Sequence, residues 1–309
     1  MQATQPATPR IPRGVAGAAL VIAAAALWAT FGLFAKRLYE ADFTALELAC
    51  IRSLIGWLGI AALALPRPGR LRISLRDVPF FALYGIAAFA LFEFLFLLTL
   101  QRTSVAIAAS LLYTAPAFVV VLSAMVLRER LPRAHWAALV LVLAGVALVT
   151  GAFSTLLAGT VAIGPAVLLS GLGAGLTYGL YTIFSKTASA RYADPIMPVF
   201  WMFAFATAAM VVVEPPWDAL SRPHDAWPAL LGLGIVPTLL PYLLYLRALR
   251  WLRASTAAML AAVEPVIAAL LAAVFLGETL DATRIAGIAL IAAAAALLAR
   301  EGKQRPCEA

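Results

Sequence analysis

Residues 100–131, LQRTSVAIAASLLYTAPAFVVVLSAMVLRERL, occur a second time in similar form as residues 249–280, LRWLRASTAAMLAAVEPVIAALLAAVFLGETL. At a shift of 149 residues Pro116 falls on Pro265 and Glu129 falls on Glu278, so the proline and the glutamate keep one spacing in both copies. These two residue types are rare inside or beside apolar segments, which gives the match its weight. We therefore predict a chain of two duplicated halves, residues 1–153 and 154–309.

The charges at the ends of the two copies indicate how the halves are oriented. The first copy ends in RER at residues 128–130, whereas the second has GET at residues 277–279. Lysine and arginine are enriched in the cytoplasmic loops of membrane proteins, so equivalent loops that differ in this way are expected on opposite sides of a membrane. The halves are therefore predicted to be inverted, as they are in many secondary transporters.

The composition indicates a polytopic membrane protein. Apolar residues make up 64% of the chain and charged residues 12%, with a mean hydropathy of +0.96, whereas soluble domains average about 45–50% and about 25%. The net charge of +8 is scattered between apolar segments and forms no basic patch, so no nucleic-acid partner is expected. Cys50 and Cys307 are too few for a disulfide framework or a metal site, and no cofactor is expected.

The apolar segments predict an all-α integral membrane fold of ten transmembrane helices, since each spanning helix needs about 20 residues. Residues 136–185 carry no charge and are expected to form two helices joined by a neutral loop where the halves meet. The expected spans are 15–35, 43–65, 78–100, 104–127, 136–153, 165–184, 195–213, 229–249, 255–276 and 285–299. Most of the 23 lysines and arginines lie on the side of the amino terminus, so both termini are expected in the cytoplasm.

These features resemble the EamA family of the drug/metabolite transporter superfamily. The resemblance rests on the ten spans, on the helix with a central proline that ends in glutamate in each half, and on LGETL at residues 276–280, AL at 248–249 and LW at 27–28. It covers nearly the whole chain. The first copy departs from the Leu-Gly-Glu signature, because Arg128 stands where the second copy has Gly277.

The resemblance implies a bacterial inner-membrane exporter of small metabolites, embedded in the lipid bilayer. It also implies a central cavity lined by every helix except the fifth and the tenth, and a substrate class that includes amino acids. Within the family, the chain resembles the YddG type of aromatic amino acid exporter. Because each half of an internal repeat supplies the partner of the other, a functional monomer is expected.

Ionisable residues inside the predicted spans are the first candidates for the substrate site, because each is expensive there and needs a partner or water. They are Arg52, Glu93 and Glu264, with Glu47 nearer the outer end of its span, from where it can reach the surface. Glu47 and Arg52 are five residues apart and lie on different helix faces. Arg52 therefore needs a partner from another helix, and depth favours Glu93, followed by Glu264. The pair is either a structural pin or a group that binds substrate or relays a proton.

Aromatic residues with a polar end are the second set of candidates, since a buried phenol or indole needs a hydrogen-bond partner. We expect them to line an amphipathic pocket, although any single one is more often a packing residue. They are Trp28, Tyr84, Tyr113, Tyr178, Tyr181, Trp201, Tyr242 and Tyr245. Pro116 and Pro265 are predicted hinges, because proline frees a backbone carbonyl within its helix.

Other patterns exclude other classes of protein. Gly171, Gly175 and Gly179 lie at a spacing of four in an apolar helix, which is typical of close helix packing and not of a nucleotide-binding loop. His135 and His224 are expected in loops on opposite sides, so neither a nucleophile-base pair nor a histidine metal site is available, and an enzyme is not expected. A receptor or assembly subunit would usually carry a soluble domain, whereas this sequence shows only loops between its apolar segments, so these classes are not expected.

The sequence therefore predicts an exporter of small metabolites, most of all amino acids including aromatic ones, that works by alternating access. A proton-coupled antiporter of drugs or cationic compounds would use the same carboxylates and stays open as an alternative. Sugar phosphates or nucleotide sugars fit less well, because Arg52 is the one clearly embedded cation.

Overall fold

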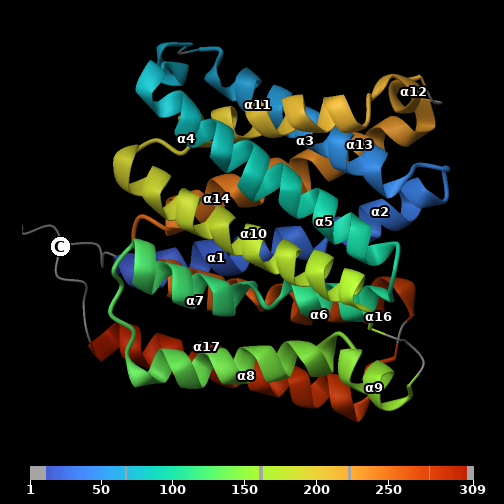
Figure 1. Cartoon of the computed structure of the whole chain (residues 1–309), viewed down its shortest axis with the longest axis vertical. Coiled ribbons are helices and arrows are strands. Elements are labelled where there is room, and N and C mark those ends of the chain that lie inside the picture. Colours follow the sequence, from blue (N-terminus) through green and yellow to red (C-terminus); the bar gives the residue numbers. More distant parts are fainter. Residues whose placement is uncertain (1–11, 67, 160–162, 222–223, 278, 305–309) are drawn as a thin grey trace, which may run out of the picture.

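The computed structural model describes residues 12–66, 68–159, 163–221, 224–277 and 279–304, and all the regular structure in these ranges is helical (Figure 1). Nine helical segments of this part are long and apolar enough to cross a membrane: Arg13–Tyr39, Ala45–Ala64, Leu75–Leu100, Val105–Val126, Pro165–Arg191, Ile196–Val213, Trp227–Ala248, Ala254–Phe275 and Ala282–Arg300. A further apolar helix, α8 (Arg133–Val149), has 17 residues. Each of the ten expected spans therefore contains a helix in the structure.

The first five segments are built as follows. The first consists of α1 (Arg13–Ala29) and α2 (Phe31–Tyr39), and the second is α3 (Ala45–Ala64). The third runs through α4 (Val78–Ala82), the π-helix η3 (Leu83–Ala90) and α5 (Leu91–Leu100), the fourth is α6 (Val105–Leu112) followed by α7 (Ala115–Val126), and the fifth is α8. The short helices η1 (Pro68–Leu71) and η2 (Leu75–Asp77) precede the third segment.

The second five begin after the short helix α9 (Ala152–Leu157), which Gly151 and Gly159 flank at φ values of 78° and 63°. They are α10 (Pro165–Arg191), α11 (Ile196–Val213), α13 (Trp227–Gly234) with the π-helix η5 (Ile235–Leu239) and α14 (Leu240–Ala248), α15 (Ala254–Ala261) with α16 (Glu264–Leu276), and α17 (Ala282–Gln304). The expected neutral loop thus contains a turn of helix, and glycine supplies the left-handed backbone on each side of it.

Two irregularities recur at equivalent places in the two halves. The helix that carries Pro116 is interrupted at residues 113–114, and the helix that carries Pro265 is interrupted at residues 262–263, positions that the shift of 149 residues superimposes. The same shift brings η3 onto η5. Both prolines lie in the first turn of the helix that follows the break, where the missing N–H costs no hydrogen bond.

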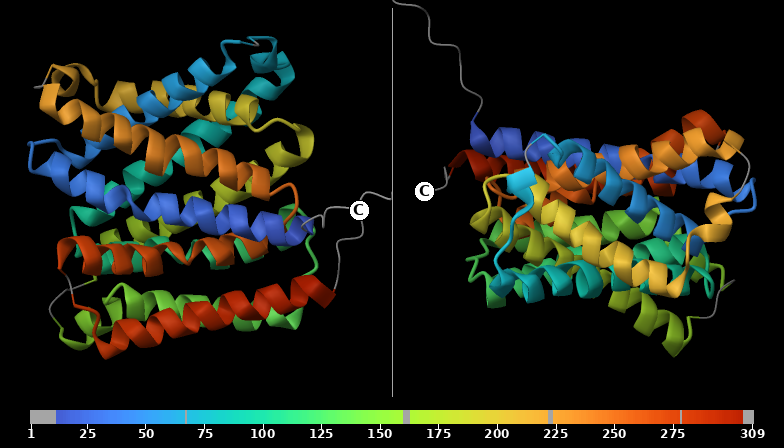
Figure 2. Two further views of the ribbon diagram at one scale, coloured as in Figure 1. Left: turned by 180° about the vertical axis from the view of Figure 1, so that it is seen from behind. Right: turned by 90° about the horizontal axis from the view of Figure 1, so that it is seen from above.

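Helices of one half pack mainly on helices of the other. Helix α1 contacts α14, α15 and α16, whereas α10 contacts η3, α5, α6 and α7. Helix α3 packs on α11 and α13. Helices α8 and α17 pack on each other and form a layer at one side of the bundle (Figures 1 and 2). Their backbones cross closely at Gly145 and Gly287, where a Cβ on Gly287 would lie 2.6 Å from the carbonyl oxygen of Gly145.

The glycine face of α10 packs against the broken fourth segment, as the sequence predicts. A Cβ added to Gly171 would lie 2.5 Å from the side chain of Leu111. A Cβ on Gly175 would lie 2.5 Å from Oγ1 of Thr114 and 3.0 Å from the carbonyl oxygen of Leu111. The absence of side chains on this face therefore lets α10 approach the break in the backbone itself.

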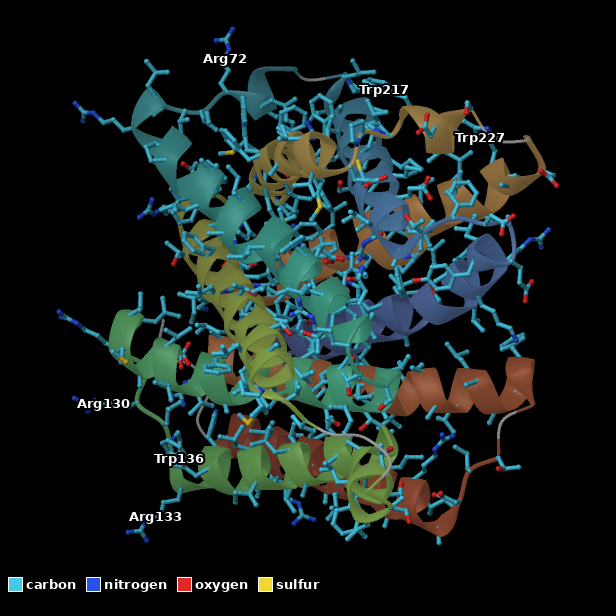
Figure 3. The ribbon with its side chains drawn as sticks, turned by 45° about the vertical axis from the view of Figure 1, so that its right-hand side comes forward. Arg72, Arg130, Arg133, Trp136, Trp217 and Trp227 are labelled. Carbon is cyan, nitrogen blue, oxygen red and sulfur yellow. The ribbon has the colours of Figure 1, made fainter. Side chains whose placement is uncertain are left out.

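One end of the bundle, where α1 begins, is rich in arginine, and we call it the basic end. Figure 3 shows Arg130 on the loop that follows α7 and Arg133 at the start of α8. The loops of this end are tied together, because Arg70 Nε lies 2.9 Å from Asp194 Oδ2 and the Tyr192 hydroxyl donates to Asp77 Oδ2 at 2.6 Å. Burial and the neighbouring Asp77 raise the pKa of Tyr192 to about 12, so this phenol keeps its proton.

Lys186 lies inside α10, because that helix continues to Arg191, seven residues beyond the expected end at Phe184. Its ammonium group donates to the carbonyl oxygens of Leu249 and Leu252, each at 2.7 Å. These carbonyls follow the carboxyl end of α14, where a helix dipole favours a positive charge. On the sequence alone, the charge of Lys186 indicates a loop after residue 184. In the structure Lys186 lies within a helix and bonds to the end of another helix.

The Gly175→Ala variant is expected to be about 1–3 kcal/mol less stable, because the added methyl group overpacks a contact between backbones. Its apparent melting temperature in detergent should fall by several degrees. Gly32→Ala is the matched control: Gly32 lies in the first segment of its half, and a Cβ there meets no atom within 4 Å. A similar fall in both variants would contradict the close-packing role of Gly175.

Candidate functional site

Arg52 and Glu93 form an ion pair inside the bundle. Nη2 of Arg52 on α3 donates to Oε1 of Glu93 on α5, and the two residues are only 6% and 5% exposed. The guanidinium carbon also lies 5.1 Å from the ring centre of Phe31 on α2. The partner that depth favoured in the sequence is therefore confirmed.

Glu47 has a different role. It occupies the third position of α3 and completes a capping box: its carboxylate accepts from the backbone N–H of Thr44 at 2.7 Å, and the Thr44 hydroxyl accepts from the N–H of Glu47 at 3.2 Å. Glu47 therefore caps a helix start at the end of the bundle opposite the basic end.

Tyr242 connects Arg52 to the first helix. Its phenol interacts electrostatically with Arg52, and its ring lies 5.5 Å from that of Trp28, edge to face. Trp28 also lies 5.4 Å from Tyr245. Two buried donors here, Nε1 of Trp28 and Nε of Arg52, have no hydrogen-bond partner among the described residues. Unsatisfied buried donors are costly, so this part of the site is suited to an acceptor group or to water.

Glu264 and Tyr113 lie at the two helix breaks. Glu264 is the first residue of α16, and Tyr113 follows the last residue of α6, so each comes from the interruption beside its proline. The Tyr113 phenol and Arg52 both interact electrostatically with the Glu264 carboxyl group. The structure therefore brings the charged candidates Arg52, Glu93 and Glu264, which come from both halves, into one site.

The remaining tyrosines stack around this site. The rings of Tyr178 and Tyr181 lie 5.9 Å apart and nearly parallel, and Tyr181 lies 5.4 Å from Tyr242. The ring of Tyr84 lies 5.8 Å from that of Tyr181 at a tilt of 31°, and the Tyr84 hydroxyl is 2.6 Å from the Ser185 hydroxyl. These rings contact one another in a continuous row that extends from the region of Glu264 toward the basic end.

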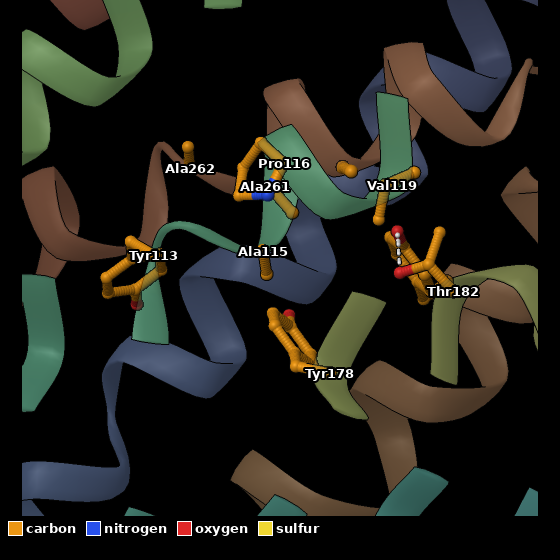
Figure 4. Close-up of a pocket in the computed structure, with 10 residues that line it drawn as sticks. Tyr113, Ala115, Pro116, Val119, Tyr178, Thr182, Ala261 and Ala262 are labelled. Carbon is orange, nitrogen blue, oxygen red and sulfur yellow. Dashed lines mark hydrogen bonds between the residues drawn. The ribbon is translucent and has the colours of Figure 1, made fainter. Parts of the chain in front are cut away.

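A small cavity opens between the two broken helices and α10 (Figure 4). Its free space is about 10 Å³, roughly the room that one water molecule needs. Tyr113 and Tyr178 line it together with Pro116, and Thr182 bonds to Tyr245 at its edge, with 3.2 Å between the hydroxyl oxygens. The site is therefore closed around very little space, and a larger ligand requires these helices to move apart.

Trp201 is the candidate that lies apart from this cluster. Its indole N–H donates to the carbonyl oxygen of Leu71 at 2.8 Å, and its ring packs on Phe200 and Phe205. It therefore ties α11 to the loop of η1 at the basic end.

The structure also adds residues that the sequence did not single out. Thr182 and Ser185 bond to the phenols, and Phe89 and Phe203 pack on Tyr242 at 5.2 and 5.4 Å. Serine, threonine and phenylalanine are common in apolar helices, so no signal marked these residues. Within the described residues, no group of three or more histidine, cysteine or acidic residues could hold a metal ion.

A bundle of membrane-length helices with opposite charges and aromatic residues at its centre, and with helices broken beside them, defines an integral membrane transporter. The model of the EamA-like transporter family matches residues 15–151 and again residues 165–300. The chain therefore belongs to the EamA-like transporter family and is a multi-pass membrane protein.

Similar proteins are transporters as well. The chain is 28% identical over 285 residues to an uncharacterized transporter of Archaeoglobus fulgidus, covering 92% of this chain and 97% of the relative. It is 30% identical over 279 residues to the pseudopaline exporter CntI of Pseudomonas aeruginosa, covering 89% and 93%. A shorter match, 31% over 128 residues, joins 40% of this chain to 41% of the threonine/homoserine exporter RhtA of Escherichia coli. A solved crystal structure has the same fold, with a TM-score of 0.76, 21% identity and coverage of 95% and 99%.

Arg52→Ala is expected to destabilise the protein by about 3–5 kcal/mol, because Glu93 loses its partner while it stays buried. The double variant Arg52→Met, Glu93→Met removes both charges and should recover most of that loss. Thermal unfolding in detergent measures both. If the double variant is no more stable than Arg52→Ala, the lost stability comes from lost packing and not from the unpaired charge of Glu93.

Proposed function

We propose that the protein exports small metabolites with amino-acid groups, including aromatic amino acids, by alternating access through ten helices in two inverted halves. The observation that carries this proposal is the pair of opposite charges, Arg52 from one half and Glu264 from the other, within one buried aromatic cluster. A zwitterion has complementary charges at its two ends and fits such a site.

The chemistry of each end supports an orientation for the substrate. A carboxylate can accept from Arg52 and from the unpartnered N–H of Trp28, as guanidinium groups bind carboxylates well. An ammonium group can donate to Glu264, with Tyr113 beside it. The rings of Tyr178 and Tyr181 offer faces for an apolar or aromatic side chain.

The relatives support export of this class of compound. RhtA is named a threonine/homoserine exporter and CntI a pseudopaline exporter. The coincident breaks beside Pro116 and Pro265 support alternating access, since discontinuous helices near the midplane are a usual place for transporter sites. The arginines of the basic end support a cytoplasmic location for that end and for both termini, with the protein in an inner membrane.

One observation favours a second candidate, a proton-coupled antiporter of cationic compounds. Two carboxyl groups, Glu93 and Glu264, share the site with a single guanidinium group. A cationic drug could bind the carboxylate that Arg52 leaves free. The same charge count disfavours sugar phosphates, which need more than one cation.

Transport by purified protein in liposomes tests the substrate class. Labelled threonine and phenylalanine should enter, and Arg52→Ala and Glu264→Gln should each lower the initial rate roughly tenfold or more, because each removes a charge-assisted hydrogen bond to the substrate. Glu40→Gln, an exposed glutamate after α2, is the control and should transport normally.

A cationic dye and a pH gradient complete the design. Amino-acid flux that the gradient leaves unchanged supports uniport. Dye flux that a proton gradient drives, without amino-acid flux, would replace the exporter with the antiporter.

The hinge function of the prolines makes a separate prediction. Pro265→Ala introduces a backbone N–H that could bond across the break to a carbonyl oxygen at the end of α15, and such a bond should stiffen the break next to Glu264. We expect several-fold slower flux with little change in substrate affinity, measured by binding of labelled substrate in detergent. Faster flux or lost binding would speak against a hinge.

A further inference from the structure

At the basic end, the loop after α7 holds the start of α15, although the two belong to different halves. Oε1 of Glu129 accepts from the backbone N–H of Ala254 at 2.8 Å. Oε2 of Glu129 accepts from the hydroxyl of Ser255 at 2.8 Å and from its N–H at 3.4 Å. One half-buried carboxylate thus makes three bonds to a helix start whose residues Ala254 and Ser255 are fully buried.

This helix start has no cap of its own. The residue at its N-cap position is Arg253, whose side chain accepts no hydrogen bond from the helix. The equivalent position of the other half is Ser104, whose hydroxyl accepts from the N–H of Ile107 and caps α6 locally. Free N–H groups at a helix start need an acceptor, and a carboxylate also favours the positive end of the helix dipole. Glu129, which belongs to the other half, supplies both the hydrogen-bond acceptor and the negative charge.

Two neighbouring bonds belong to the same contact. Nε2 of His135, at the start of α8, lies 3.1 Å from Oγ1 of Thr256. Nη1 of Arg253 donates to the carbonyl oxygen of Arg130 at 3.4 Å. Arg128 adopts a positive φ of 55°, which turns the chain so that Glu129 faces α15. We call these contacts between residues 128–135 and residues 253–256 the cross-half clasp.

We propose that the cross-half clasp is the latch of the cytoplasmic gate, and that Glu129 is the residue that keeps this gate closed. This inference rests on the alternating access proposed above, in which the two halves must separate at the basic end to admit substrate. Separation would break all three bonds of Glu129 and expose the uncapped start of α15. The carboxylate therefore stabilises the closed conformation over the open one.

The asymmetry between the halves gives the proposal its direction. At the opposite end, α6 keeps its cap from Ser104 whether or not the halves separate, because the donor and the acceptor lie in one segment. Loss of Glu129 should therefore open the basic end without loosening the other end. If Glu129 only stabilised the fold, its loss would loosen both ends of the bundle alike.

Cysteine accessibility tests the latch without any substrate. Ala257→Cys on α15 and Ala108→Cys on α6 report on the two ends; these positions are equivalent in the repeat, and both are 0% exposed. Each is placed in a background with Cys50→Ala and Cys307→Ala, in lipid nanodiscs. A small charged thiol reagent should label the thiol introduced at position 257 roughly tenfold faster when Glu129→Gln is added, because charge-assisted bonds are lost.

The control positions and variants make the outcome decisive. Labelling at position 108 should stay constant or slow, and Ser255→Ala should give a smaller increase at position 257, since it removes one of the three bonds. Glu40→Gln should change neither rate. Constant labelling at position 257 in Glu129→Gln and Glu129→Ala, or an equal increase at both positions, would overturn the proposal.

The design also separates this inference from the transport proposal. If liposomes fail to transport amino acids but labelling at position 257 still depends on Glu129, the proposed substrate class is wrong and the latch stands. Normal transport with labelling independent of Glu129 would do the reverse. Melting temperatures of the variants, measured in the same nanodiscs, show whether a change in labelling reflects gating or unfolding; a Glu129 effect that tracked the melting temperature would overturn the latch.

Discussion

The need to neutralise one guanidinium group inside the bundle shapes the centre of this protein. An unpaired charge at that depth is prohibitive, so Arg52 brings Glu93 from α5 and the phenol of Tyr242 from α14 to one point. Those partners come from both halves, which fixes how the halves sit against each other. Because Glu264 also interacts with Arg52, any rearrangement at the helix breaks changes the electrostatic balance of the pair.

The second constraint is that a broken helix exposes backbone polar groups, which lipid cannot satisfy. In the fourth segment the Thr114 hydroxyl donates to the carbonyl oxygen of Leu111 at 2.6 Å, and the glycine face of α10 covers the break. Close approach by α10 in turn puts Tyr178 beside Tyr113 at the cavity, with Tyr181 stacked on Tyr178. The glycines thus help to place the site through backbone packing, as the charged residues do through their interactions.

Periodicity, charge and the internal repeat were enough to predict the helices, the partner of Arg52 and the packing role of Gly171, Gly175 and Gly179. The end of α10 was not predictable, because Lys186 marks a loop by its charge and only the carbonyls of Leu249 and Leu252 explain it within a helix. The π-helices and the contributions of Thr182 and Ser185 depend on contacts between distant segments, which single-sequence patterns do not encode. Glu278, the repeat partner of Glu129, lies outside the described residues.

The family model matches the chain twice, at residues 15–151 and 165–300, and the two parts differ at equivalent positions in charge and in helix capping. Glu264 follows a helix break where the first half has Ala115, so one broken helix carries an ionisable group and the other presents a methyl group to the cavity. At the basic end Arg253 leaves uncapped the helix start that Ser104 caps in the other half. A symmetric pair of halves would bind a symmetric ligand and open equally at both ends. In the proposed alternating access, the unequal cap would make closure at the basic end depend on a contact between halves, whereas the cap of α6 comes from Ser104 within its own segment.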